Sequence, residues 1–234
     1  MPSPNQILIR AIIQGDVAQV EALLTAGVAV NTTGGVTPVG ASNTALMWAA
    51  AEGHLEIVDL LLAHGASVNE QNDAQYTALM FAAEAGYRDI VSILLDHKAG
   101  IHPRNPYAET VLMAMARQGQ TDLVQRLVGM GAEVNARNKI GDTALYLAVD
   151  HGHSYTVKAL IELGGEVNTE NLGGWTPLMM AAARGDLETI SLLLQHGADF
   201  RPRNRWGATA LSEARKSFRS QQAADLLIQA GAME

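Results

Sequence analysis

The chain has 234 residues and a formal net charge of −8 at pH 7, from 24 acidic and 16 basic side chains. A chain with this negative charge is repelled by phosphate backbones and by anionic membranes. We therefore expect that its partner is neither a nucleic acid nor a membrane. It is 48% hydrophobic but only 5% aromatic, which predicts an aliphatic core, and the lack of cysteine excludes disulfides, thiolate metal sites and a cysteine nucleophile.

The N-terminal segment resembles no targeting sequence. No apolar run reaches the length of about 18 residues that a membrane-spanning helix needs. The first residues, MPSPNQILIRAIIQGD, lack the basic region and the small-residue cleavage site of a signal peptide. We therefore expect a cytoplasmic protein, or a periplasmic or secreted one if a signal peptide has been removed.

The first predicted helix is unusually apolar, with Ile7, Leu8, Ile9, Ile12 and Ile13 in one short stretch. Part of this set must face outwards, because a helix buries only one stripe against its neighbour. The end of the chain that holds this helix is either a partly exposed cap or a surface that packs on something else.

An insertion follows at residues 32–43, TTGGVTPVGASN. Asn31 and Thr44 are 13 positions apart, whereas the corresponding Asn69 and Thr77 are eight apart. The five extra residues lengthen one loop only. Loops that contact partners often stand out in this way, but a tolerant surface turn also accepts insertions, and the sequence leaves both explanations open.

From Thr44 onwards the sequence repeats itself every 33 residues. The stretch TALMWAAAEGHLEIVDLLLAHGASVN at 44–69 returns as TALMFAAEAGYRDIVSILLDHKAGIH at 77–102. A fixed period of this length is the signature of a stacked repeat architecture. Two markers keep the period through the rest of the chain, a glycine at 53, 86, 119, 152 and 185 and a threonine at 44, 77, 110, 143, 176 and 209.

Each repeat predicts two helices. The threonine is placed to cap a short alanine-rich helix, which ends at the marker glycine. A second helix follows, with one broad apolar face formed by residues such as Ile57, Val58 and Leu61. Gly65 and its equivalents then stop that helix in the left-handed conformation. Lys98 replaces this glycine in one repeat, and the nearby Gly100 suggests that the helix end is shifted there.

These units resemble ankyrin repeats, whose pattern combines T-P-L-H, A-A-x-x-G-H, I-V-x-L-L-L and G-A-D-V-N. The resemblance implies an all-α solenoid of stacked helix–turn–helix units with β-turn fingers, over a single domain at 1–234. The motif histidine is absent, and Met47, Met80, Met113 and Met179 replace it as buried fillers, in a TALM form typical of bacterial ankyrin proteins. The predicted units are about 4–33, 34–71, 72–104, 105–137, 138–170, 171–203 and 204–234.

The sequence contains no catalytic or metal-binding pattern. There is no phosphate-binding glycine loop, no H-E-x-x-H and no G-x-S-x-G motif. His151 and His153 are two positions apart, so we expect them to point in different directions. We therefore predict no enzymatic activity, no cofactor and no metal site.

The partner site is expected on a concave face formed by the fingers and the first helices. The residues at these positions differ from one repeat to the next, because the packing of the repeats does not fix their identity. The aromatic ones are either binding anchors, as interface statistics favour, or rings that cover a neighbouring turn. The predicted contact residues are Tyr76, Tyr107, Glu109, Ile140, Asp142, Leu172, Trp175, Trp206, Arg117, Asp150, His151 and Arg184.

Charge is distributed unevenly along the chain. Residues 1–100 contain 10 acidic and 3 basic side chains, whereas residues 201–234 contain 6 basic and 3 acidic ones. This asymmetry could orient a partner, since electrostatics sets register and encounter rate more than affinity. A solvated cap and contact with nucleic acid are the alternative explanations for the basic end.

The resemblance implies a monomeric module that binds another protein through a rigid, preorganised surface. An adaptor and an inhibitor or immunity-type protein that blocks a partner enzyme are both compatible with the sequence. For an inhibitor, the loop at 32–43 would be the obvious blocking element. An enzyme subunit or ligand sensor whose site forms only at an interface is the rival class.

Overall fold

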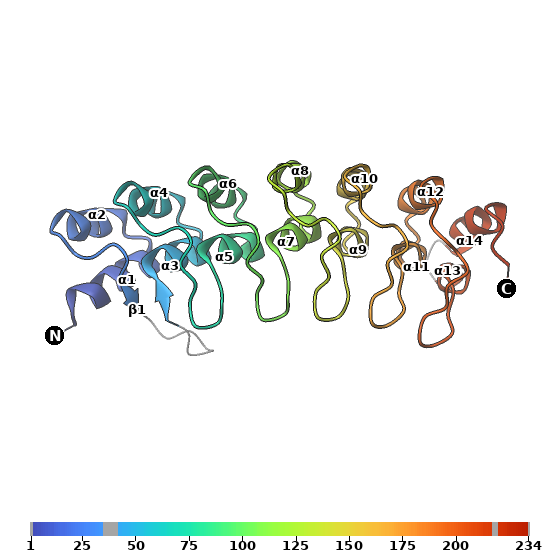
Figure 1. Ribbon diagram of the computed structural model, residues 1–234, viewed down its shortest axis with the longest axis horizontal. Helices are drawn as coiled ribbons and strands as arrows, with labels where there is room; N and C mark the ends of the chain where they lie inside the picture. Colours follow the sequence, from blue (N-terminus) through green and yellow to red (C-terminus); the bar gives the residue numbers. More distant parts are fainter. Residues whose placement is uncertain (1, 35–41, 217–219, 234) are drawn as a thin grey trace. The chain divides into compact units, whose positions relative to one another are not determined.

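The computed structural model describes residues 2–34, 42–216 and 220–233. Over these residues the chain forms fourteen helices and two short strands, which confirms the predicted all-α class (Figure 1). The chain divides into two compact units, Met1–Pro106 and Tyr107–Glu234, called here the N-terminal unit and the C-terminal unit. None of the described helices combines the length and the hydropathy that a membrane-spanning segment needs.

In the N-terminal unit, helices of two kinds alternate and form two layers. α1 packs on α3 and α3 on α5 in one layer, while α2 packs on α4 and α4 on α6 in the other. The helices are α1 (Pro4–Gln14), α2 (Val17–Thr25), α3 (Ala45–Glu52), α4 (Leu55–Ala63), α5 (Ala78–Ala85) and α6 (Arg88–Asp96).

The C-terminal unit follows the same plan. Its inner layer is α7, α9, α11 and α13, from which the loops project, and its outer layer is α8, α10, α12 and α14 (Figure 1). The helices are α7 (Val111–Arg117), α8 (Thr121–Gly129), α9 (Ala144–Asp150), α10 (Ser154–Glu162), α11 (Pro177–Arg184), α12 (Leu187–Gln195), α13 (Ala210–Ala214) and α14 (Ser220–Gln229).

The repeated threonine begins each inner helix after α1, as predicted, while α1 is capped by Ser3. Its hydroxyl accepts a hydrogen bond from the backbone N–H three residues later, at 3.2 Å in α3 and α11 and 3.3 Å in α7. This bond satisfies one of the backbone donors that a helix N-terminus leaves without an intrahelical partner. The capping residues are Thr44, Thr77, Thr110, Thr143, Thr176 and Thr209.

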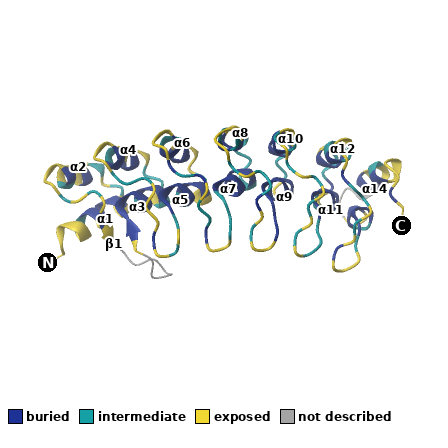
Figure 2. Ribbon diagram, in the orientation of Figure 1, coloured by how far each residue is buried: buried dark blue, intermediate teal, exposed yellow. Residues whose placement is uncertain are grey.

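The core is aliphatic and lies between the two layers (Figure 2). Most alanines on the inner helices are almost fully buried, such as Ala49, Ala82 and Ala181, so these helices can approach one another closely. The methionines of the TALM motif are also buried, which confirms that they are core residues and not a surface strip. They are Met47, Met80, Met113 and Met179.

The end of α6 corrects one expectation. Lys98 has a φ of +63° and occupies the same left-handed position as Gly65, whose φ is +83°. The hydrogen bonds are also equivalent, since Lys98 N donates to Leu95 O at 3.0 Å and Gly65 N to Leu62 O at 3.0 Å. The helix end is therefore not shifted towards Gly100. The hydrogen bonds at the end of α6 hold the backbone in this conformation despite a lysine Cβ that disfavours it by about 1–2 kcal/mol.

The N-terminal helix and the insertion are described in part. In α1, Leu8, Ile9 and Ile12 are buried and Ile13 is 39% exposed, so only a small part of the apolar set faces outwards. The insertion begins and ends as an antiparallel ribbon of β1 (Thr33–Gly34) and β2 (Asn43–Thr44). Residues 35–41, on which the prediction of a partner-binding loop falls, lie outside the described residues.

Candidate functional site

The fingers of the C-terminal unit share one backbone frame. We define a finger as the five residues that precede a capping threonine, such as 138–142, 171–175 and 204–208. The asparagine at its start accepts hydrogen bonds from the backbone N–H groups two and four residues later, at 2.9–3.1 Å. These bonds fix the turn, so the side chain at its tip is presented outwards.

Neighbouring fingers are joined through their backbones. Lys139 N donates to Tyr107 O at 2.9 Å, and Leu172 N donates to Ile140 O at 2.8 Å. A third bond of the same register links Arg205 N to the carbonyl of Gly173 at 3.0 Å. The fingers therefore form one hydrogen-bonded row, and the spacing between their tips is already fixed before a ligand binds.

Large apolar side chains stand on this row and face solvent. The framework does not need them, because a finger closes through the asparagine and the backbone alone. A contiguous exposed apolar surface of this kind commonly marks an interaction site. The apolar tip row, as we call it, consists of three tip residues, Tyr107 at 66% exposed, Ile140 at 59% and Trp206 at 75%, and of Leu172 at 54%, which precedes the glycine at the tip of its finger.

The rings of two tryptophans lie so close to Gly173 that a side chain would not fit there. A Cβ built on Gly173 would lie 3.1 Å from Trp175 Cδ1 and 3.7 Å from Trp206 Cζ3. Both rings therefore flank the position where the other fingers have a tip side chain. Trp175 is half-buried and Trp206 is exposed, so the pair offers ring faces at the surface.

Asp142, at the foot of its finger, differs from the expectation. We expected this position to be released from packing, but Asp142 is only 5% exposed. Its Oδ1 accepts a hydrogen bond from Nδ2 of Asn171 at 2.9 Å, so the carboxylate is partly buried by the next finger. Burial raises the pKa of Asp142, the hydrogen bond from Asn171 lowers it, and the charge of Asp150 raises it further.

Three charged residues predicted for the site gather around Asp142. Glu109, Arg117 and Asp150 are close enough to influence its charge, the carboxylates raising its pKa and the guanidinium lowering it. Arg117 pairs with Glu109. The result is an acidic patch of Glu109, Asp142 and Asp150 with one arginine, placed between the apolar tip row and the ends of the inner helices.

The helix-end residues are held by backbone carbonyls. Arg184 is exposed, and its guanidinium donates to the carbonyl of Asp150. His151 Nδ1 lies 3.0 Å from Leu147 O, and His153 Nε2 lies 2.9 Å from Arg117 O. The expectation that the two imidazoles point in different directions is wrong. Their rings are stacked, 6.4 Å apart and inclined by 12°, because Gly152 turns the backbone between them with a φ of +76°.

Tyr76 is the one predicted contact residue outside the C-terminal unit. It belongs to the N-terminal unit, where its ring stacks on Phe81 with centroids 5.0 Å apart. The eleven other predicted residues belong to the C-terminal unit. The ring of Tyr76 thus contacts the inner helix of its own repeat.

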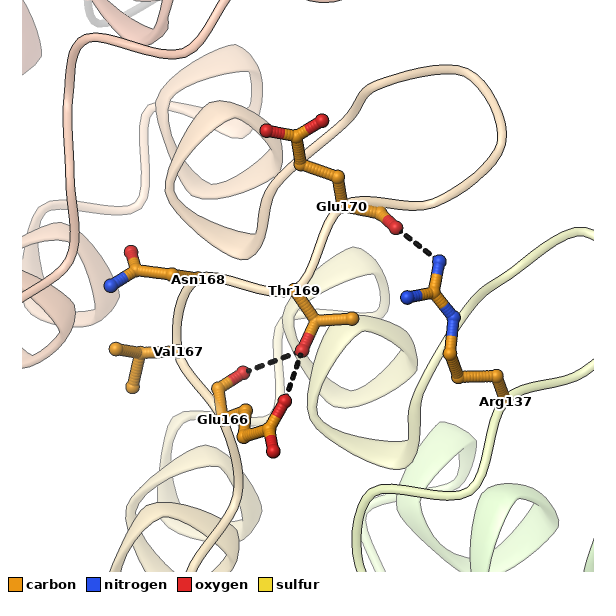
Figure 3. A pocket seen from close by; sticks show the side chains of 6 residues that line it. All are labelled: Arg137, Glu166, Val167, Asn168, Thr169 and Glu170. Carbon is orange, nitrogen blue, oxygen red and sulfur yellow. Dashed lines mark hydrogen bonds between the residues drawn. The ribbon is translucent and has the colours of Figure 1, made fainter.

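A nearby hollow is a poor alternative site. It has a volume of about 520 Å³ and lies against the loop 166–170, next to Arg137 (Figure 3). The polar groups of the hollow bond to one another, since Thr169 Oγ1 donates to Glu166 and the guanidinium of Arg137 donates to Glu170 O. These bonds hold the loop in place and use polar groups that a ligand would otherwise bind.

Sequence reasoning missed several residues of the surface. Lys139 and Arg205 precede tip residues and are exposed beside them, and Gly173 makes room for the tryptophans. The 33-residue period was a sufficient signal for Lys139 and Arg205, since both share the position of Leu172. Within the part of the chain that the structure describes, no three His, Asp or Glu side chains come together as metal ligands.

Comparisons with known proteins agree with this architecture. The model of the family described as ankyrin repeats matches residues 8–105, 98–171 and 156–233. A crystal structure of the human ASB11 ankyrin repeat domain is similar, with a TM-score of 0.78 and 28% identity over 97% of this chain and 99% of that one. No curated protein sequence matches. Ankyrin repeats generally mediate protein–protein interaction and are typically non-catalytic, and this chain belongs to the ankyrin-repeat family.

Proposed function

We propose that the chain is a non-catalytic protein-binding module of seven ankyrin units, with the unit bounds given above. The partner docks on the fingers and inner-helix ends of the C-terminal unit. The observation that carries this proposal is the apolar tip row, four large side chains exposed on consecutive fingers. A ring or branched aliphatic chain that faces water in this way gains free energy when a partner covers it.

The apolar tips alone are not enough for tight binding. Full burial of one such side chain is worth about 1.5–3 kcal/mol, while association costs about 4–15 kcal/mol in lost freedom. Four such side chains would contribute at most about 6–12 kcal/mol, which is about the size of that cost. Additional affinity must come from polar contacts, for which Arg117, Asp150, His151 and Arg184 stand next to the row.

Preorganisation lowers the cost on this side of the interface. The asparagine bonds and the backbone bonds between fingers already fix the tips. The finger backbones therefore lose little conformational entropy when a partner binds. The partner is a folded surface or an extended segment that follows the row of fingers.

The test is an affinity capture from a lysate of the source organism with three baits. The first is the unaltered chain, and the second has Tyr107→Ser, Ile140→Ser and Trp206→Ser on the tip row. The third is a matched control with Met130→Ser and Tyr155→Ser, two exposed apolar residues beside and on the outer helices of the same unit. All three must show the same helical circular dichroism.

The expected result is a protein retained by the unaltered chain and the control but lost from the tip variant. Equal retention on all three baits would place the partner on another surface. Loss from the control alone would move it to the outer helices. Retention on none would contradict the protein-binding proposal and direct attention to an enzyme subunit or ligand sensor.

A narrower prediction is that this chain is an inhibitor or immunity-type protein that blocks a partner enzyme. This prediction depends on the insertion at 32–43. The bacterial origin inferred from the TALM motif is likewise a prediction. The described part of the insertion is only the ribbon of β1 and β2. No contact or charge in that ribbon favours an inhibitor over an adaptor.

A further inference from the structure

We propose that the partner enters this surface with an arginine side chain, which stacks on Trp175 beside Trp206 and directs its charge towards the acidic patch. The inference rests on the proposed function and adds the chemistry of the residue that is recognised. It joins two features, the tryptophan pair around Gly173 and the carboxylates Glu109, Asp142 and Asp150.

The tryptophan pair provides the stacking surface. Trp175 Cδ1 and Trp206 Cζ3 both lie within 4 Å of the position that a Gly173 side chain would occupy. The finger that contains Gly173 thus lacks a tip side chain of its own between the two rings. A flat group of a partner cannot enter between the rings, because even a Cβ there would lie only 3.1 Å from Trp175, but it can contact the solvent-facing parts of half-buried Trp175 and exposed Trp206.

The acidic patch lies next to Trp175 along the fingers. Trp175 N donates to Oδ1 of Asn171 at 3.0 Å, and the amide of the same asparagine donates to Asp142 at 2.9 Å. One side chain thus connects the stacking surface to the buried carboxylate. Trp175 and Asp142 also occupy the same position in consecutive fingers.

The charge of the patch is only partly offset within the chain. Arg117 pairs with Glu109, and His151 Nδ1 lies 3.8 Å from a carboxylate oxygen of Asp150. The guanidinium of Arg184 donates to the backbone carbonyl of Asp150. Asp142 receives a neutral amide. Because burial raises the pKa of Asp142, its ionised form is disfavoured in the free protein, and a cation from a partner would relieve that cost.

Arginine suits both features better than other cations. Its planar guanidinium stacks on aromatic rings and still presents N–H donors to a carboxylate, whereas a lysine ammonium is a compact and strongly hydrated charge. Arginine is also enriched among the residues that dominate interfaces. A bare metal ion fits poorly, because no group of three metal-ligating side chains occurs among the described residues.

The experiment exploits the three tryptophans of the chain. Their indole N–H signals are assigned by single Trp→Phe variants and followed by NMR during titration with a short capped peptide, Gly-Leu-Arg-Leu-Gly. The comparison peptide has citrulline in place of arginine, which keeps the planar shape and removes the charge. Trp48 is an internal control, since it belongs to the N-terminal unit and its Nε1 donates to Gly34 O at 2.6 Å.

The expected result is a saturable shift of the Trp175 and Trp206 signals with the arginine peptide and no shift of Trp48. The citrulline peptide should bind about tenfold more weakly. Asp142→Asn and Glu109→Gln should each weaken the arginine peptide, while Glu188→Gln, which removes an exposed charge from α12, should not. Trp175 and Trp206 signals at unaltered positions in each free variant, together with the same helical circular dichroism, show that the C-terminal unit is folded.

Other outcomes overturn the inference and separate it from the proposed function. Equal shifts with both peptides would mean that the surface binds apolar groups without reading the charge. No shift with either peptide would also overturn arginine recognition. In both cases a partner lost only from the tip-row bait would leave the protein-binding proposal intact. Failure of both experiments would contradict both.

Discussion

The fingers of the two units have the same frame but different tips. In the N-terminal unit, Asn72 accepts from the N–H groups of Ala74 and Tyr76 at 3.0 and 2.9 Å. Asn171 of the C-terminal unit makes the equivalent bonds at 2.9 and 3.0 Å. The N-terminal tip is a small alanine, whereas the C-terminal tips Tyr107, Ile140 and Trp206 are large, apolar and exposed.

This difference shows that one set of finger residues stabilises the fold and that another set is available for binding. Bonds from asparagine and threonine close the finger in both units, so they explain stability and not selectivity. Only the residue two positions after the asparagine changes in character. The predictions below test whether frame and tip are as independent as the structure implies, and they start with the largest expected effect.

Removal of core volume should affect both units equally. Leu94 of α6 and Leu193 of α12 occupy the same position in their repeats and are both 0% exposed. Leu94→Ala and Leu193→Ala should each lower the free energy of unfolding by about 2–5 kcal/mol, through lost burial and the cavity left behind. Urea denaturation followed by circular dichroism measures this. Trp206→Ala should stay within about 0.5 kcal/mol of the unaltered chain, as expected for an exposed residue.

Loss of the frame should destabilise both fingers but impair only one site. Asn72→Ala and Asn171→Ala each remove three hydrogen bonds, including the amide bonds to Asn43 and Asp142 respectively. We expect each to cost about 2–4 kcal/mol, because buried partners lose their bonds. Only Asn171→Ala should also weaken partner capture. Equal weakening by Asn72→Ala would show that the N-terminal finger contributes to binding.

The frame was predictable from the sequence because it repeats. The 33-residue period gave the capping threonines, the buried methionines and the alternation of helices, all of which follow from local hydrogen bonding and apolar patterning. Exposure at the tips, as at Tyr107 and Trp206, also followed from position. These features depend on the residue and its place in the unit, and both can be read from one chain.

Relations between repeats were not predictable in this way. The burial of Asp142 comes from Asn171, a residue of the next finger, and the stacked imidazoles of His151 and His153 depend on the turn at Gly152. The left-handed Lys98 is a related case. Its side chain favours another backbone conformation, but the hydrogen bonds at the end of α6 hold it in place.

Non-glycine residues in left-handed conformations offer a way to strengthen the frame without altering the tips. Lys98 at the end of α6 has a φ of +63°, and Gln75 in the N-terminal finger has a φ of +65°. Lys98→Gly and Gln75→Gly should each raise the free energy of unfolding by about 0.5–1 kcal/mol, as strain is removed and some chain entropy is lost. The reverse control is Gly65→Ala, which has open space around its Cβ and should cost about 1 kcal/mol. A loss of stability in Lys98→Gly would mean that the lysine side chain makes a contact worth more than the strain.

The smallest effect concerns the charge of Asp142, and it tests whether the acidic patch is kept at the expense of stability. Burial raises the pKa of this carboxyl above its ordinary value of 3.8, so the folded protein favours the protonated form. The ionised carboxylate therefore lowers stability at neutral pH, and this penalty disappears as the pH falls below the unfolded-state value. Asp142→Asn should raise the free energy of unfolding at pH 7, with a gain that shrinks towards pH 4.

Asp199→Asn is the control with the opposite sign, because hydrogen bonds from Arg201 lower the pKa of Asp199. This variant should lose stability at pH 7, and the loss should fade as the pH falls. A gain for Asp142→Asn that is independent of pH would show that packing, and not charge, is responsible; a gain that follows the pH while arginine recognition is lost would indicate that the carboxylate is retained for binding.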